Sequence, residues 1–177
     1  MYPSVQSCPD FIVSSSTGEK QLLVEIKRWL PSAIEDAPTT WVKQARQRWQ
    51  LPACYVLLVT PERMVLWPPY SSVAPSVRPS VTISVAPSVR PSAPARQGPA
   101  VTKASAEVLA NYLNVERYPL KALSEEELSL VVSSWLGSVI FKPEATLLEM
   151  PAQAWLVESG LHAAIYRGFI RRQVAVN

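Results

Sequence analysis

The chain has 177 residues, of which 48% are hydrophobic, and its 17 Lys and Arg against 14 Asp and Glu give a formal net charge of +3. A chain of this length builds one domain of ordinary size, and its apolar content is enough to bury a core. No run of about 18 apolar residues occurs, and the first ten residues lack the basic-then-apolar order of a signal peptide. The sequence therefore predicts a soluble, cytoplasmic protein without a membrane partner.

The first predicted element is a β-hairpin. Residues 10–13 and 21–27 are rich in strand-forming side chains, and the Ser, Thr and Gly residues between them favour a turn. Because side chains alternate along a strand, Glu25 and Lys27 are expected on one face of the second strand. Its apolar residues then face the other way: Leu22, Val24 and Ile26.

A helix and two further strands are predicted next. Residues 39–50 place Trp and Ala side chains on one face of a helix that follows Pro38. Residues 54–59 form a continuous apolar run, which is typical of a central strand covered on both sides. Residues 64–67 would form the second arm of another hairpin.

Residues 68–103 form a linker rich in Pro, Ser and Arg. The nonapeptide SVAPSVRPS occurs at 72–80 and again at 84–92, so the unit repeats every 12 residues. Such a segment has little to bury, which predicts extended or disordered structure rather than a repeat fold. The linker carries four basic residues and no acidic one, so it accounts for the basic charge of the whole chain.

The chain beyond the linker is predicted to be helical. Helices are expected at 104–113, at 124–140, where Ser124 and Glu127 form a capping box, and at 151–168. A last strand is predicted from residue 169 onward. The expected fold is therefore α/β: residues 1–67 form a core with a mixed β-sheet flanked by helices, and the helical C-terminal portion, 104–177, packs on the same core.

Asp10 and Glu25 are the candidate functional carboxylates. In a hairpin, Asp10 comes beside Glu25. Two carboxylates held close together repel each other, and chiefly a divalent cation between them offsets this repulsion. Oxygen ligands suit Mg²⁺ or Mn²⁺. Lys27, on the same strand face as Glu25, is then placed to orient or deprotonate a water, or to stabilise charge on a phosphate.

The sequence Pro-Asp, a hairpin, and Glu25-Ile26-Lys27 resembles the PD-(D/E)xK nuclease superfamily, whose members share the restriction-endonuclease-like fold. The resemblance implies that Asp10 and Glu25 ligate Mg²⁺ and that Lys27 assists phosphodiester hydrolysis. The order strand, strand, helix, strand is also similar to the central sheet of that family. In addition, the chain resembles short bacterial proteins, common in cyanobacteria, that begin near a Pro-Asp-Phe strand and end in a W-L-x-E-S-G-L helix. This second resemblance implies no particular activity.

Members of the superfamily usually have a helix before the first strand, which often adds a Glu to the site, and nine residues before Asp10 cannot supply it. Three alternatives stay open: an incomplete site, a helix supplied by a partner protein or a second copy in a homodimer, and a C-terminal helix that brings Glu158 to the site. A solvated position is the competing interpretation for Glu158.

The helix at 39–50 carries further candidates for nucleic-acid contact. The resemblance implies an accessory role for Gln44 and phosphate contacts for three basic residues: Lys43, Arg46 and Arg48. An ordinary solvated basic face is the alternative. Taken together, the sequence predicts a Mg²⁺- or Mn²⁺-dependent nuclease, DNA being the expected partner, or an inactive relative. A non-enzymatic interaction protein of the same fold is the alternative.

Overall fold

The computed structural model describes residues 9–29, 38–50, 53–69 and 101–173. Its centre is a six-stranded mixed sheet with the order β5-β4-β3-β2-β1-β6. The strands are β1 (Phe11–Ser14), β2 (Lys20–Ile26), β3 (Tyr55–Val59), β4 (Arg63–Trp67), β5 (Val101–Ala104) and β6 (Phe169–Arg172).

In this six-stranded sheet, one pair of neighbouring strands is parallel and the other pairs are antiparallel. β2 and β3 pair in parallel, with Leu22 opposite Tyr55 and Glu25 opposite Leu58, whereas every other neighbouring pair is antiparallel. A parallel pair needs a crossover connection, and α2 (Pro38–Trp49) lies within it. The sheet is therefore built from two antiparallel halves that meet at β2 and β3.

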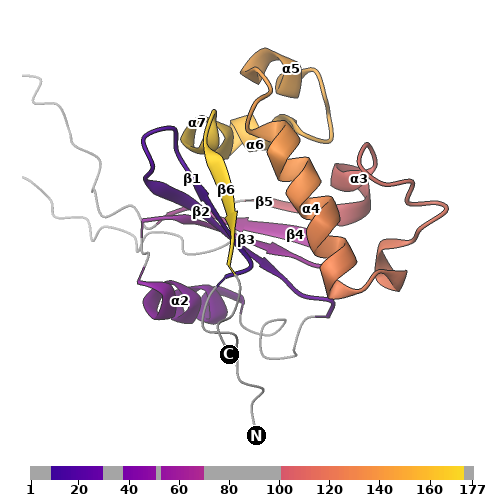
Figure 1. Ribbon diagram of the computed structural model, residues 1–177, viewed down its shortest axis with the longest axis horizontal. Helices are drawn as coiled ribbons and strands as arrows, with labels where there is room; N and C mark the ends of the chain where they lie inside the picture. The colour runs from indigo at the N-terminus through magenta and orange to yellow at the C-terminus, as the bar shows by residue number, and fades with distance from the viewer. Residues whose placement is uncertain (1–8, 30–37, 51–52, 70–100, 174–177) are drawn as a thin grey trace, which may run out of the picture.

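Helices cover both faces of this sheet (Figure 1). Of the described helices, α2 lies on one face and the C-terminal helices gather on the other. These are α3 (Ser105–Leu109), the 3-10 helix Leu120–Ala122, α4 (Glu125–Val139), α5 (Glu144–Leu148), α6 (Ala154–Glu158) and α7 (Leu161–Ile165). The C-terminal portion thus packs on the same sheet as the N-terminal portion.

Two hydrophobic clusters follow from the alternation of side chains along the strands. Leu22, Val24 and Ile26 belong to the large cluster under α4 and its neighbouring helices. Leu23 belongs to the smaller cluster under α2, which includes Val42 and Trp67. The side of β2 that carries Leu23 and Glu25 therefore faces α2.

The main predicted elements are present. The fold is mixed α/β, and the hairpin, the helix after Pro38, the two apolar strands, the long helix and the last strand are all confirmed. The turn of the hairpin closes through a hydrogen bond from the Ser15 N–H to the Glu19 carbonyl, with Gly18 at φ 89°. Ser124 and Glu127 form the predicted capping box at the start of α4. Among the described residues, no helix is long and apolar enough to cross a bilayer.

The structure differs from the prediction in four places. The helix predicted at 104–113 is confined to Ser105–Leu109. Val101–Ala104 forms strand β5, although residues 101–103 were predicted to belong to the linker. The predicted repeat, at 72–80 and 84–92, lies outside the described residues. The single helix predicted at 151–168 is two short helices, because Gly160 adopts the left-handed conformation, φ 76°, between them. The short helix α5 was not predicted.

Candidate functional site

The β1–β2 hairpin brings Asp10 to Glu25. Phe11 pairs with Val24, and continuing this register by one residue would bring Asp10 opposite Glu25. Residues directly opposite in an antiparallel pair have their Cβ atoms about 4.5–5.5 Å apart. The Asp10 carboxylate is also fixed, because its Oδ2 accepts a 2.7 Å hydrogen bond from the Ile26 N–H. Because Ile26 follows Glu25, the Asp10 carboxylate lies beside the segment of β2 that carries Glu25.

Glu25 is fully buried, which is costly for a carboxylate. Burial raises the pKa of Glu25 from its usual 4.5 to about 7, although the neighbouring Lys27 opposes the rise and the charges of Asp10 and Glu125 add to it. Among the described residues, no group donates a hydrogen bond to its Oε2. Glu25 thus offers a buried carboxylate oxygen, Oε2, that no described residue satisfies.

Lys27 is the ion partner of Glu25. Its Nζ lies 2.9 Å from Glu25 Oε1, and 23% of its side chain is exposed. Burial by itself lowers the pKa of Lys27, but the carboxylates of Glu25 and Asp10 outweigh this effect, and the net direction is upward. The Lys27 N–H also donates to the Val59 carbonyl, which holds this residue against the end of β3. Lys27 therefore contacts the buried Glu25 carboxylate and is also partly exposed to solvent.

Glu125 is a carboxylate near this pair that the sequence analysis did not assign to the site. It is half-buried at the start of α4, and its charge raises the pKa of both Glu25 and Lys27. Leu128, one turn further along α4, packs in the same core as Ile26. The acidic run of residues 125–127 was the available signal, but a capping box and a favourable helix dipole explain that run without a site.

Glu158 is placed elsewhere. It is exposed at the end of α6, and the next residue, Ser159, accepts a hydrogen bond from the Tyr55 hydroxyl. Tyr55 begins β3 and pairs with Leu22, three residues before Glu25 along β2. Three residues of strand span about 10 Å, so α6 packs beside the opposite end of the strand. The structure gives no support to Glu158 as the missing acid.

Arg46 was predicted to contact nucleic acid, but in the structure its side chain is buried. It is buried on α2, and its guanidinium donates to the backbone carbonyls of Cys54, Trp67 and Pro68. These carbonyls lie just before β3, at the end of β4 and just beyond it. Arg46 therefore ties α2 to the sheet, and a phosphate cannot reach its buried side chain in this structure. The sequence placed Arg46 on the helix correctly but gave no sign of which carbonyls lie beneath it.

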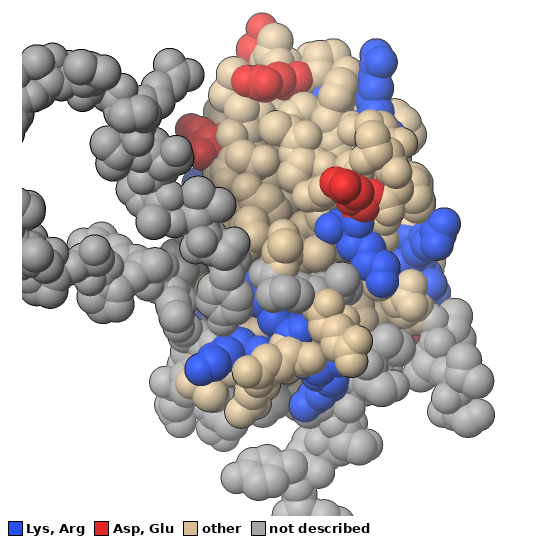
Figure 2. Space-filling view, turned by 90° about the vertical axis from the view of Figure 1, so that its left-hand side faces the viewer, with Lys and Arg blue, Asp and Glu red and all other residues tan. Residues whose placement is uncertain are grey.

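Lys43, Gln44 and Arg48 are exposed on α2. Figure 2 shows the molecule from the left-hand side of Figure 1, and most of the Lys and Arg side chains on that face gather in its lower half, where α2 lies. Their exposure is compatible with phosphate contact. No described contact joins these three residues to Asp10, Glu25 or Lys27, so their role stays a prediction.

The donor set of the site suits a hard cation. Asp10 and Glu25 provide carboxylate oxygens, which Mg²⁺ and Mn²⁺ prefer, and no donor in the described part of the chain bonds the buried Glu25 Oε2. The described residues contain no group of three or more His, Cys, Asp or Glu side chains placed to hold a metal. A cation bound here would therefore rest on two carboxylates, with water or substrate completing its coordination, as is usual for Mg²⁺.

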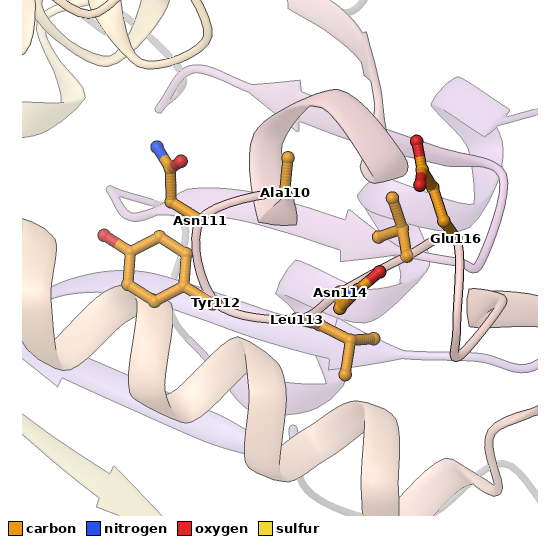
Figure 3. A pocket seen from close by; sticks show the side chains of 7 residues that line it. Ala110, Asn111, Tyr112, Leu113, Asn114 and Glu116 are labelled. Atoms are coloured by element: carbon orange, nitrogen blue, oxygen red, sulfur yellow. The ribbon is translucent and has the colours of Figure 1, made fainter.

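A hollow on the surface is separate from these carboxylates. It is lined entirely by the loop after α3, from Ala110 to Glu116. Figure 3 shows the side chains of Asn111, Tyr112 and Asn114 around it. None of the residues with candidate chemistry lines this hollow, so it is not the predicted site.

Comparisons with known proteins leave the family of the chain open: no protein-family model, no curated protein and no solved structure matches it. Interpretation of the site therefore depends on its own geometry.

Proposed function

We propose that this protein is a divalent-cation-dependent phosphodiesterase that acts on nucleic acid, with Asp10, Glu25 and Lys27 as its working residues. The observation that carries the proposal is the buried Glu25 carboxylate. Its neighbour Ile26 donates to the Asp10 carboxylate, Lys27 contacts it at 2.9 Å, and one of its oxygens has no donor among the described residues. A buried carboxylate is unfavourable unless it is ion-paired, hydrogen-bonded or bound to a metal, and Lys27 contacts only its Oε1.

The roles of the three residues follow from their surroundings. Asp10 and Glu25 would hold Mg²⁺ or Mn²⁺, which when bound polarises a phosphodiester and lowers the pKa of a bound water. The pKa of Lys27 is raised, so its side chain stays an ammonium group at neutral pH. Lys27 is therefore better suited to stabilise negative charge on a phosphate than to accept a proton from water.

The fold and the sequence resemblance agree with this proposal. The hairpin, the crossover helix α2 and the parallel strand β3 have the order expected for the PD-(D/E)xK superfamily. Hydrolysis in such a site adds water across a P–O ester bond and yields a phosphate monoester and an alcohol. DNA is the first substrate to test, and RNA the second.

One observation favours a non-enzymatic alternative. Glu25 is 0% exposed and already has Lys27 as an ion partner, which is what a structural ion pair inside a scaffold protein would look like. The two functions differ in whether Asp10 and Glu25 jointly bind a cation. Metal binding is therefore the property to measure first.

The test is a calorimetric Mn²⁺ titration of the full chain beside Asp10→Asn, Glu25→Gln and Glu158→Gln. The first two substitutions preserve size and remove one carboxylate each, and the third removes an exposed carboxylate beside the opposite end of the strand. We expect one binding event in the wild type and in Glu158→Gln, and none in the other two. Mn²⁺-dependent cleavage of a mixed DNA and RNA pool should be lost in the same two variants. Absence of Mn²⁺ binding in the wild type, with and without nucleic acid, would overturn the proposal in favour of the scaffold.

A further inference from the structure

Trp29 is an exposed aromatic residue close to the candidate site. Its side chain is 73% exposed, a larger fraction than for Phe141 or any other described large hydrophobic side chain. It follows Lys27 by two residues, and two residues of chain span at most about 7 Å. Single exposed hydrophobic side chains are common on protein surfaces. The position of Trp29 beside the candidate site, rather than its exposure alone, is what suggests a ligand.

The two residues before Trp29 are cationic, and each has an acidic neighbour: Glu25 for Lys27 and Glu127 for Arg28. Arg28, between Lys27 and Trp29, is exposed, and it lies close enough to α4 to lower the pKa of Glu127 after the dominant effect of the Ser124 hydrogen bonds. Beside the site, the chain thus presents the order ammonium, guanidinium, indole. Cationic side chains that follow a phosphate backbone, together with an aromatic ring on which a base stacks, form the usual combination for binding single-stranded nucleic acid.

We infer that Trp29 stacks on an unpaired base of a single-stranded nucleic acid whose phosphates pass Lys27 and Arg28. This inference rests on the proposed function, because it names the substrate class of the same site. Stacking on an indole needs an open base face, and inside a duplex both faces are covered by neighbouring base pairs. The geometry therefore favours a single strand, or an unpaired region, over an intact duplex.

The experiment measures binding of fluorescently labelled 12-residue oligo(dT), oligo(U) and a DNA duplex by anisotropy, in EDTA so that no cleavage occurs. The proteins are the wild type, Trp29→Ala, Trp29→Phe and Phe141→Ala. Phe141 is the matched control, since it is 66% exposed just beyond the far end of α4 from Glu125. We expect Trp29→Ala to weaken single-strand binding about 5- to 100-fold, the usual effect of removing one stacking platform. Trp29→Phe should retain most of the affinity, and Phe141→Ala all of it.

Duplex binding should change little in Trp29→Ala, because phosphate contacts dominate it. Comparison of oligo(dT) with oligo(U) identifies DNA or RNA as the preferred single strand. The inference is wrong if Trp29→Ala binds single strands as tightly as the wild type, if it weakens duplex binding equally, or if the wild type binds neither oligonucleotide. Failure of the proposed function would be a separate result. Single-strand binding through Trp29 without any Mn²⁺ binding would support the inference about Trp29 and contradict the proposed nuclease activity.

Discussion

Asp10 Oδ2 accepts a 2.7 Å hydrogen bond from the backbone N–H of Ile26, the residue that separates Glu25 from Lys27. One carboxylate of the candidate site is thereby tied to the backbone of the strand that carries the other two groups. Because the donor is a main-chain group of β2, the hydrogen bond fixes the Asp10 side chain relative to that strand. The hydrogen bond also gives Asp10 a structural function that can be separated from metal binding.

Substitutions at Asp10 should therefore differ in stability according to whether they keep an acceptor for the Ile26 N–H. Asp10→Ala leaves the part-buried Ile26 N–H without its acceptor, and we expect a loss of about 1–3 kcal/mol in the free energy of unfolding. Asp10→Asn keeps an oxygen acceptor and should cost less than about 1 kcal/mol. Both variants should fail to bind Mn²⁺. Urea denaturation and calorimetry measure the two effects; equal stability of the two variants would contradict the role of the hydrogen bond.

The stability of the metal-free protein should fall as the pH rises from about 4.5 to about 7. Over this range the Glu25 carboxyl is ionised in the unfolded chain but still protonated in the folded one, whose pKa is about 7. The folded state then binds the extra proton, so the free energy of unfolding decreases with pH and levels off above pH 7. The total decrease is about 3 kcal/mol if the unfolded pKa is normal.

Glu25→Gln isolates this effect because glutamine has the same shape and does not titrate. We expect the difference in stability between Glu25→Gln and the wild type to grow in favour of the variant from pH 4.5 to 7 and then to stay constant. Urea denaturation in EDTA at four or five pH values measures it. A difference that does not vary with pH would show that Glu25 ionises normally in the folded protein.

Mn²⁺ binding should show the opposite dependence on pH. A cation binds the ionised form of Glu25, so below pH 7 binding must displace a proton, and the apparent affinity should fall up to about tenfold per pH unit. Above pH 7 the affinity should be nearly constant. Titrations at pH 6 in two buffers with different ionisation enthalpies should detect the released proton. Affinity independent of pH between 5.5 and 8 would exclude Glu25 as a ligand.

Arg46 and Arg48 offer a matched pair on one helix. Arg46 is buried against three backbone carbonyls, and hydrogen bonds from a charged donor contribute about 1.5–3 kcal/mol each. Arg46→Ala should therefore destabilise the fold by about 3 kcal/mol or more, whereas Arg48→Ala, on the exposed face, should change stability by less than about 0.5 kcal/mol. Chemical denaturation of both variants provides the comparison. A weaker effect at Arg46 than at Arg48 would contradict the packing described for α2.

The hairpin could be predicted from the sequence because its evidence is local. Alternation along 21–27 separates Glu25 and Lys27 from Leu22, Val24 and Ile26, and a turn rich in Ser and Gly fixes the partner strand. From these facts alone Asp10 comes beside Glu25. Strand β5 escaped prediction because it is a short edge strand at the end of a segment rich in Pro and Ser, and its pairing with β4 is a long-range contact.

The positions of Arg46 and Glu125 could not be read from the sequence for a different reason. In both cases the local sequence pattern is explained without a site. Arg46 lies in a run that predicts a basic helix face, and Glu125 lies in the acidic first turn of a helix with a capping box. Their actual surroundings depend on where α2 and α4 lie on the sheet. That placement follows from the packing of whole faces rather than from any short motif.

Glu125 provides the last test of the site. Its charge raises the pKa of Glu25, so Glu125→Gln should lower that pKa and shift the pH-dependent loss of stability to lower pH. Glu126 is the matched control: it is exposed and next in sequence, and it is not among the charges that act on Glu25. We expect Glu126→Gln to reproduce the wild-type profile. The Glu125 side chain would have no part in the site if both variants gave the same profile. If Glu125→Gln lost Mn²⁺ affinity and Glu126→Gln did not, and if the loss were larger than Coulomb repulsion explains, Glu125 would be a third carboxylate that binds the cation with Asp10 and Glu25.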